Sequence, residues 1–136
     1  MRKQNWPELL DKYIRESGRR EYEYQHFNCV TFGAAWVIIS TGINMLKGIK
    51  YKDKNEALSI LENSGGLFKM TEDRMADAGF KTVNPALAKR GDVVGFFTKT
   101  HGETVGICVG KQFASPGLHE LVFLPMRDAV KAWEII

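Results

Sequence analysis

A cysteine lies at the front edge of a long apolar segment, in surroundings that suit nucleophilic chemistry. Cys29 follows Asn28 in the stretch QHFNCVTFGAAWVIISTG, and the residues after it are apolar nearly all round a helix. At the first turn of a helix, unpaired backbone N–H groups and the helix dipole stabilise a thiolate. The alternative is that Cys29 is a small core residue, because free cysteine is among the most buried residue types.

A cysteine nucleophile also needs a histidine as base and a third polar group that orients this histidine. The chain has three histidines. His26 lies three residues before Cys29, His101 lies in the connection between two predicted strands, and His119 opens the next predicted strand. Each of them can equally be a solvated residue of a loop or a strand edge. The pattern therefore predicts a set of candidate catalytic residues, Cys29, His101 and His119, with His26 as a weaker substitute base.

The sequence predicts neither a metal site nor a cofactor. It contains no paired C-x-x-C or H-x-x-x-H spacing of the kind that binds zinc. The segment GKQFASPG lacks the Gly-Lys-Ser/Thr ending of a phosphate-binding loop. The two cysteines, Cys29 and Cys108, are expected to be free thiols, because no export signal accompanies them.

Four helices are predicted before residue 80, and they would position the cysteine. The first runs from Asn5 as N-cap to Gly18 and has one apolar face. The second covers Cys29–Thr41, with Asn28 as N-cap, and is apolar nearly all round, which is typical of a buried helix. A third begins at Asp53, which has capping-box spacing to Glu56, and a fourth covers residues 67–78.

From Phe80 onward the pattern changes to short β-branched and aromatic segments separated by Gly and Pro. Residues 91–97, 104–110 and 119–125 are predicted strands of an antiparallel meander, and the C-terminal segment is expected to hold a helical turn and a last short strand. Asp92 is expected to fix the turn into its strand. Helices followed by strands indicate an α+β fold, in a single domain that spans residues 1–136.

Composition and charge exclude several classes of function. The chain has 136 residues, of which 44% are hydrophobic and 26% charged, which is ordinary for a globular domain. A formal net charge of +3, with acids and bases interleaved, gives no indication of nucleic-acid binding. No apolar run of about 18 residues is present, so no membrane span is predicted. The N-terminus lacks the apolar centre and cleavage site of a signal peptide.

The order of the motifs resembles a known family. Cysteine at the start of a buried helix, then RGDVVGFF, then TVGICVG and a further strand, is similar to the NlpC-type cysteine peptidases, compact relatives of papain that cut cell-wall peptides. More closely, the chain from the Trp6 helix to GLHELVFLP and AWEII resembles a small family of phage and prophage tail-tip proteins related to that clan. The resemblance implies a reduced papain-like fold, with the N-terminal helices packed on a small antiparallel sheet.

The chain departs from the NlpC pattern at the base. Asn28 stands where that family usually has aspartate, and Thr104 occupies the position where the motif His-Val-Gly-Ile would place the catalytic histidine. Threonine cannot act as a base near neutral pH, so His101 would have to be bent back by the hairpin, and His119 would be the third polar group. Because residues two apart in a strand share a face, the resemblance implies that Thr104 looks toward Cys29 and that Cys108 lies near the same cleft.

Two functions follow from the resemblance, and both remain open at this point. In one, the protein is a component of a phage tail tip or baseplate, made in the bacterial host cytoplasm and carried in the virion tail, with a degenerate catalytic site and with tail hub or tip proteins as partners. In the other, it is an active endopeptidase or amidase that cleaves peptidoglycan peptides with Cys29 as nucleophile. A papain relative of the transglutaminase or acetyltransferase type is a further alternative.

Overall fold

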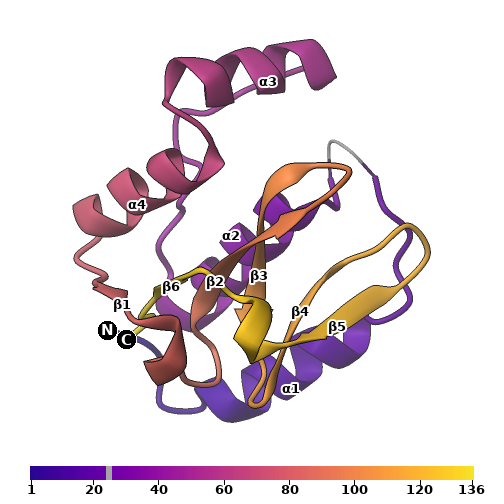
Figure 1. The fold of residues 1–136 in the computed structure, drawn as a ribbon. Helices are drawn as coiled ribbons and strands as arrows, with labels where there is room; N and C mark the ends of the chain where they lie inside the picture. Colours follow the sequence, from indigo (N-terminus) through magenta and orange to yellow (C-terminus); the bar gives the residue numbers. More distant parts are fainter. Residues whose placement is uncertain (24–25) are drawn as a thin grey trace.

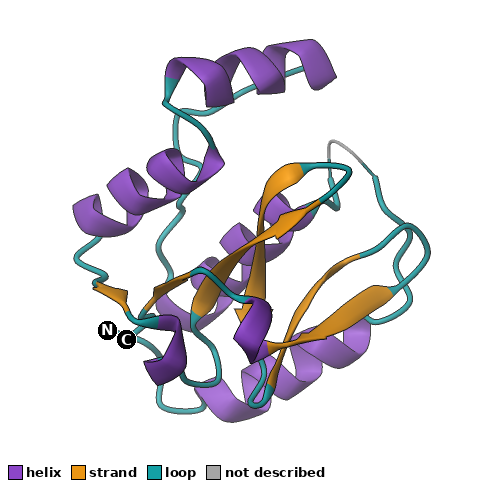
Figure 2. Ribbon diagram, viewed as in Figure 1, coloured by secondary structure: helices purple, strands orange, loops and turns teal. Residues whose placement is uncertain are grey.

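Four α-helices and one six-stranded sheet make up the described part of the chain, residues 1–23 and 26–136, in this computed structural model (Figures 1 and 2). The helices are α1 (Trp6–Ser17), α2 (Cys29–Thr41), α3 (Lys54–Asn63) and α4 (Leu67–Asp77). The strands are β1 (Thr82–Val83), β2 (Val93–Thr98), β3 (Gly102–Cys108), β4 (Gln112–Pro116), β5 (Leu121–Pro125) and β6 (Lys131–Trp133). Helices first and strands afterwards confirm the predicted α+β class.

The sheet has the order β1-β6-β2-β3-β4-β5, and every pair in it is antiparallel. The three predicted strands appear as β2, β3 and β5, but β4 lies between the last two, and the predicted helical turn and last strand appear as Met126–Asp128 and β6. Two strands, β1 and β4, were not predicted. The strand assigned to residues 119–125 begins two residues late, at Leu121, so His119 lies in the bend before β5 instead of opening it.

The hairpins β2–β3 and β4–β5 spread apart from a common base (Figure 1). Strands β2 and β3 pair along six residues, and β4 and β5 along five. Between β3 and β4, however, the register holds only Ile107 opposite Ala114 and Cys108 opposite Phe113. Beyond these pairs, Ser115 Oγ donates to the carbonyl of Val105 at 2.9 Å. The two hairpins therefore share a short ladder and leave a gap at the far end.

Helix α2 lies against the sheet and is capped by its predicted N-cap. The side chain of Asn28 accepts hydrogen bonds from the N–H groups of Val30 and Thr31, both at 2.9 Å. Thr31 Oγ1 accepts from the Asn28 N–H in return, also at 2.9 Å, which completes a capping box. Gly42 ends the helix with a φ of 81°, in the left-handed region that favours glycine. These bonds fix Cys29 as the first residue of the helix.

The face of β3 that packs on α2 differs from the expected one. Val105 and Ile107 lie in apolar clusters with Val37 and Trp36 of the helix. Cys108 is fully buried on the opposite face, in a cluster with Phe113. The expectation that Thr104 and Cys108 share the Cys29 side of the sheet is therefore wrong. A buried apolar helix gains more from covering the larger apolar side chains of the strand.

Helix α4 packs on the core through Phe68, whose ring contacts Trp133 of β6, and α3 lies farther from the sheet (Figure 1). Asp53 caps α3 by accepting from the Glu56 N–H at 2.9 Å, as predicted. The N-cap of α4 is Gly66, which has no side chain to offer, and a carboxylate from β3 takes this role. Glu103 Oε1 accepts from the Phe68 N–H at 2.9 Å. Gly66 has a φ of 104°, in the region that favours glycine, and a Cβ there would lie 2.9 Å from the same oxygen.

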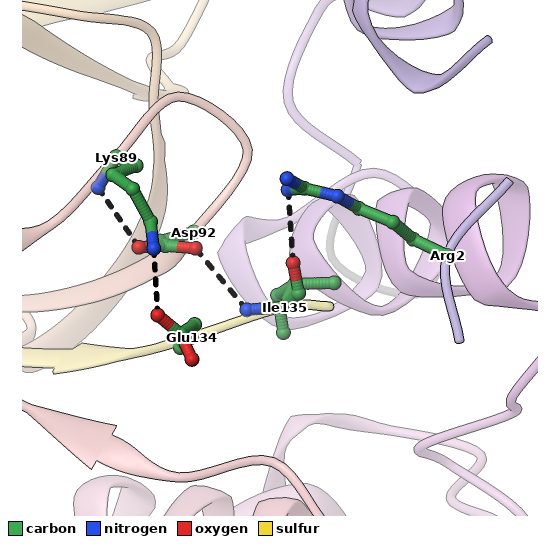
Figure 3. Close-up of polar contacts among 5 residues, drawn as sticks. All are labelled: Arg2, Lys89, Asp92, Glu134 and Ile135. Carbon is green, nitrogen blue, oxygen red and sulfur yellow. Dashed lines mark hydrogen bonds and ion pairs between the residues drawn. The ribbon is translucent and has the colours of Figure 1, made fainter. Parts of the chain in front are cut away.

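Asp92 fixes the turn that leads into β2, as predicted (Figure 3). Its fully buried carboxylate accepts from the Lys89 N–H at 2.8 Å and from the Ile135 N–H at 3.1 Å. Burial raises the pKa of this carboxyl, and the two N–H groups lower it by less. The side chain of Lys89 pairs with Glu134 at 2.7 Å, and Arg2 donates to the carbonyl of Ile135 at 3.0 Å. Asp92 thus joins the turn at Lys89 to the C-terminal segment, and Arg2 joins the N-terminus to the same segment.

Across the described residues, no helix has both the length and the apolar character needed to cross a bilayer. Both cysteines are free thiols. Cys29 is half-buried, whereas Cys108 has no exposed surface.

Candidate functional site

A cavity of about 570 Å³ opens where the two hairpins spread apart, at the head of α2. Volumes of this size are typical of ligand sites. Its walls come from α2, from the segment before α3, from α3 and α4, and from both hairpins. The lining residues are Tyr22, Asn28, Cys29, Val30, Leu46, Ile49, Tyr51, Lys54, Ala57, Leu58, Ile60, Leu61, Leu67, Met70, Phe96, Thr98, Thr100, His101, Glu103, Thr104, Ser115, Pro116, Gly117, Leu118, Val122 and Leu124.

Cys29 lies on the wall of this cavity, at the place where α2 meets the edge of β3. The thiol of Cys29 interacts with the backbone N–H groups of Cys29, Val30 and Val105. These groups lower the thiol pKa, as expected at a helix N-terminus. Burial acts in the opposite direction and is the larger influence, so the pKa of the Cys29 thiol is raised above its ordinary value. No imidazole is among the groups that shift it. At this helix terminus the effect of burial on the thiol pKa is thus larger than that of the backbone N–H groups.

Asn28 and Thr31 hold the backbone around the thiol. Beyond its two backbone bonds, the amide nitrogen of Asn28 donates to the hydroxyl of Tyr51 at 3.4 Å. Asn28 is buried, with 7% of its surface exposed, and it also lines the cavity. The position that carries aspartate in the NlpC pattern is thus filled by a capping residue. Its contacts go to the helix backbone and to a tyrosine of the opposite wall.

His101 is the predicted base that the structure brings to the same cavity as Cys29. It lies in the turn between β2 and β3, where its N–H donates to Thr98 Oγ1 at 2.9 Å. Its ring stacks on Tyr22, with 6.4 Å between the ring centroids and 27° between the planes. The side chain lines the cavity from its exposed rim. His101 therefore shares the cavity with the thiol, and its aromatic contact is to Tyr22.

The other two histidines lie outside the cavity lining. The side chain of His119 is 82% exposed, and its Nδ1 lies 3.8 Å from Glu21 Oε1. His26 is 66% exposed on its side chain, with Nε2 3.7 Å from Glu23 Oε1. The structure thus brings His101 and Cys29 to one cavity but not His119, which was the predicted third polar group.

Thr104 also lines the cavity, although its strand turns the Val105 face toward α2. Its hydroxyl donates to the carbonyl of Gly102 at 3.1 Å. Across the gap, Ser115 makes its bond to the Val105 carbonyl. The residue in the expected histidine position therefore serves the backbone of its own strand.

Most of the cavity wall was not predicted from the sequence. The side that faces α2 carries Leu46, Ile49, Ile60 and Leu61, which pack at the margin of the core cluster around Val105. Apolar positions of α3 are visible in the sequence, but an amphipathic helix does not reveal whether its apolar face meets a core or an empty cavity. The wall on β4 and β5 was missed because β4 itself was not predicted.

The lining of the cavity offers the Cys29 thiol, the exposed imidazole of His101 and several hydroxyls. Across the described residues, no cluster of three or more His, Cys, Asp or Glu side chains could hold a metal ion. Lys54 supplies an ammonium group and Glu103 a carboxylate to the lining, and the carboxylate of Glu103 accepts from the N–H of Phe68 at the start of α4. The arrangement is suited to binding apolar groups.

The comparisons with known proteins place the chain in a family. Residues 1–135 match the family described as Domain of unknown function (DUF6950), and the chain belongs to this family. No curated protein matches the chain.

Proposed function

We propose that the protein is a structural component of a phage tail tip or baseplate, built on a papain-like fold whose cysteine does not act as a nucleophile. The observation that carries the absence of catalysis is Thr104 in the position of the expected histidine, and burial, which raises the pKa of the Cys29 thiol, acts in the same direction. The papain-like assignment is supported by the position of Cys29 at the head of a buried helix that packs on an antiparallel sheet. The phage-tail context comes from the sequence resemblance.

The surroundings of Thr104 support the same reading. A cysteine peptidase lowers the pKa of its thiol with a neighbouring imidazole, which then takes the thiol proton. Here the position of the expected histidine holds a threonine whose hydroxyl bonds to its own backbone. The cavity nevertheless remains, lined mainly by apolar side chains. A cleft without an activated nucleophile is suited to holding a partner.

The first test is the pH dependence of Cys29 alkylation by iodoacetamide in a Cys108→Ala background. Because burial raises the pKa of the Cys29 thiol, we expect the rate to keep rising beyond the ordinary thiol pKa, without a plateau at neutral pH. The unfolded protein in urea is the matched control and should titrate at the ordinary value. A plateau in the folded protein below about pH 7 would show an activated thiolate and overturn the proposal.

The tail context is tested separately by mass spectrometry of purified phage particles. We expect peptides of this chain in intact particles, in constant ratio to the tail hub protein. Their absence from particles that contain all other tail proteins would remove the structural role.

The second candidate is an active peptidase or amidase that cleaves peptidoglycan peptides. It is favoured by one observation, that Cys29 and His101 line the same cavity. In this case Cys29→Ala and His101→Ala should both abolish release of peptides from purified cell walls, whereas His119→Ala should leave the rate unchanged. Hydrolysis by the Cys29→Ala variant at the wild-type rate would end this candidate.

A further inference from the structure

We propose that α3 is a lid of the cavity: the segment of residues 48–66 turns about its two ends and closes the apolar face of α3 onto the β4–β5 hairpin. The structure has the lid in its open arrangement, with the cavity between α3 and the hairpin. Such a lid controls access to the cavity whether the cavity holds a partner or acts on a substrate, so it goes beyond the proposed function.

Helix α3 is loosely attached to the rest of the fold. Among the described elements, the close packing joins α1, α2, α4 and the strands, and α3 takes no part in it (Figure 1). Ile60 and Leu61 are only partly buried, at the margin of the core cluster around Val105. The bond from the Asn28 amide to the Tyr51 hydroxyl ties the segment to α2, but at 3.4 Å it is long. An element with few buried contacts moves at a low cost in free energy.

Two side chains anchor the chain just outside the segment. Before it, the guanidinium of Arg74 in α4 donates to the carbonyl of Lys47 at 2.8 Å. After it, Glu103 of β3 accepts from the N–H of Phe68 at 2.9 Å. Phe68 is itself buried, and its ring contacts Trp133 of the sheet. The two ends of the segment are therefore held by α4 and the sheet, and α3 lies between these fixed points.

Glycines lie at both ends of the segment, where a lid needs hinges. Gly48 has a φ of 81°, and Gly65 has a φ of 85°. A Cβ built on Gly48 would meet no other part of the described chain within 4 Å, so there is room for the backbone to turn. Hinges are a few residues that absorb changes in φ and ψ, and glycine does so at the lowest steric cost.

Apolar side chains on both rims of the cavity supply the driving force for closure. Leu58 of α3 lines the cavity and is 47% exposed. On the hairpin side, Val122 and Leu118 also line the cavity and are 41% and 72% exposed. Bringing α3 onto the hairpin would remove these side chains from water, which is favourable. The open arrangement leaves them in contact with solvent.

The test is the distance between two spin labels, measured by pulsed electron paramagnetic resonance in a Cys29→Ser, Cys108→Ala background. One label is placed at Ser59→Cys on α3 and the other at Glu120→Cys beside β5, both at exposed positions. We expect two populations of distances. Ammonium sulfate strengthens apolar burial, so it should raise the population with the shorter distance at least about twofold.

A control pair separates movement of the lid from a change of the whole fold. It combines Glu120→Cys with Lys12→Cys, an exposed position of α1. Helix α1 and strand β5 share a core cluster through Leu10 and Leu121. We therefore expect a single distance for this pair, with and without sulfate.

A variant tests the apolar rim. Leu58→Glu places a charge on the face that closes, so the ratio of closed to open lid should fall about tenfold. Leu87→Glu is the matched control: Leu87 is 71% exposed and lies outside the lining, so the ratio should not change. Circular dichroism checks that both variants fold, and the sulfate series on the labelled parent tests the lid if Leu58→Glu does not.

Three results would overturn the lid. They are a single distance between α3 and the hairpin that sulfate does not shift, two populations that Leu58→Glu leaves unchanged, and an equal shift in the control pair. Catalysis is tested separately by the alkylation of Cys29 and by hydrolysis of cell walls. A fixed α3 would therefore leave the proposed function standing, and an activated thiolate would leave the lid standing.

Discussion

An ionisable group of a neighbouring segment lies beside each end of strand β3, and the two groups differ in their surroundings. At the Cys108 end, the carboxylate of Asp92 accepts two backbone N–H groups, and the chain closes around it. At the Gly102 end, the thiol of Cys29 faces a cavity of about 570 Å³. Burial raises the pKa of both groups.

The difference shows that a buried titratable group is not by itself a functional site. At the closed end, the Asp92 carboxylate bonds to two backbone N–H groups, one from the turn at Lys89 and one from the C-terminal segment at Ile135. These contacts hold the fold together, and the described chain leaves no space for a ligand beside the buried carboxylate. At the open end, the polar groups border space that a ligand can fill. Function is therefore to be sought where the strands separate, and stability where they meet.

The largest effect is expected from removing the Asp92 carboxylate at the closed end. Asp92→Ala removes the acceptor of the part-buried Lys89 N–H and of the buried Ile135 N–H, so we expect a loss of about 2–4 kcal/mol in the free energy of unfolding. Urea denaturation measures this, with the exposed Asp128→Ala as a control that should stay within about 0.5 kcal/mol of the wild type. A change of less than about 0.5 kcal/mol at Asp92 would mean that this carboxylate does not hold the closed end together.

The pH dependence of the free energy of unfolding also reports on the buried carboxyl of Asp92. The pKa of Asp92 is raised in the folded protein, so folding favours the protonated form. The contribution of Asp92 to stability is therefore full below its ordinary pKa of 3.8 and declines as the pH rises through its folded pKa. The stability of the wild type minus that of Asp92→Asn, measured by urea denaturation from pH 3 to 7, should fall with rising pH. An increase would show that the two N–H bonds outweigh burial.

A smaller effect is expected from the carboxylate at the open end. Glu103→Gln keeps an acceptor for the Phe68 N–H but removes the negative charge from the start of α4, which should cost about 0.5–1 kcal/mol. Thermal unfolding measures this, and the exposed Glu120→Gln serves as the matched control. A loss as large as that of Asp92→Ala would mean that the two ends are equally closed.

The smallest effect is expected from placing a histidine at position 104, where the resemblance to the NlpC family locates the catalytic base. In Thr104→His, the new imidazole stands on the strand face opposite to the Val105 side chain, so we expect the pH profile of Cys29 alkylation to remain that of the wild type. The measurement uses the Cys108→Ala background with and without the Thr104→His change. A shift of the profile toward neutral pH would show that an imidazole at this position does reach the thiol.

The local elements were predictable because their signals lie in neighbouring residues. Asn28 and Gly42 bound helix α2 in the sequence as they do in the structure, and Asp53 marks the start of α3. Asp92 was interpreted correctly as a turn residue. Strand β4 was missed because its residues, Gln112–Pro116, are rich in small and turn-forming types that resemble a loop.

The site was predictable only in part, because it depends on the register between distant strands. Cys29 and His101 were identified from their types and places along the chain. Which face of β3 meets α2 depends on tertiary packing, and the choice of the Val105 face moved Cys108 away from the cavity. The short β3–β4 ladder, which opens the cavity, leaves no local signal in the sequence.

The position of β6 inside the sheet has a consequence for how the protein is made. This strand pairs with both β1 and β2, so it joins the edge strand to the rest of the sheet. It is also synthesised after all the others. During translation, helices and the β2–β5 meander can form from local contacts, whereas the sheet closes only when β6 leaves the ribosome. We expect the pairing of β6 to be the last step in forming the sheet, with Asp92 among the last groups to find its partners.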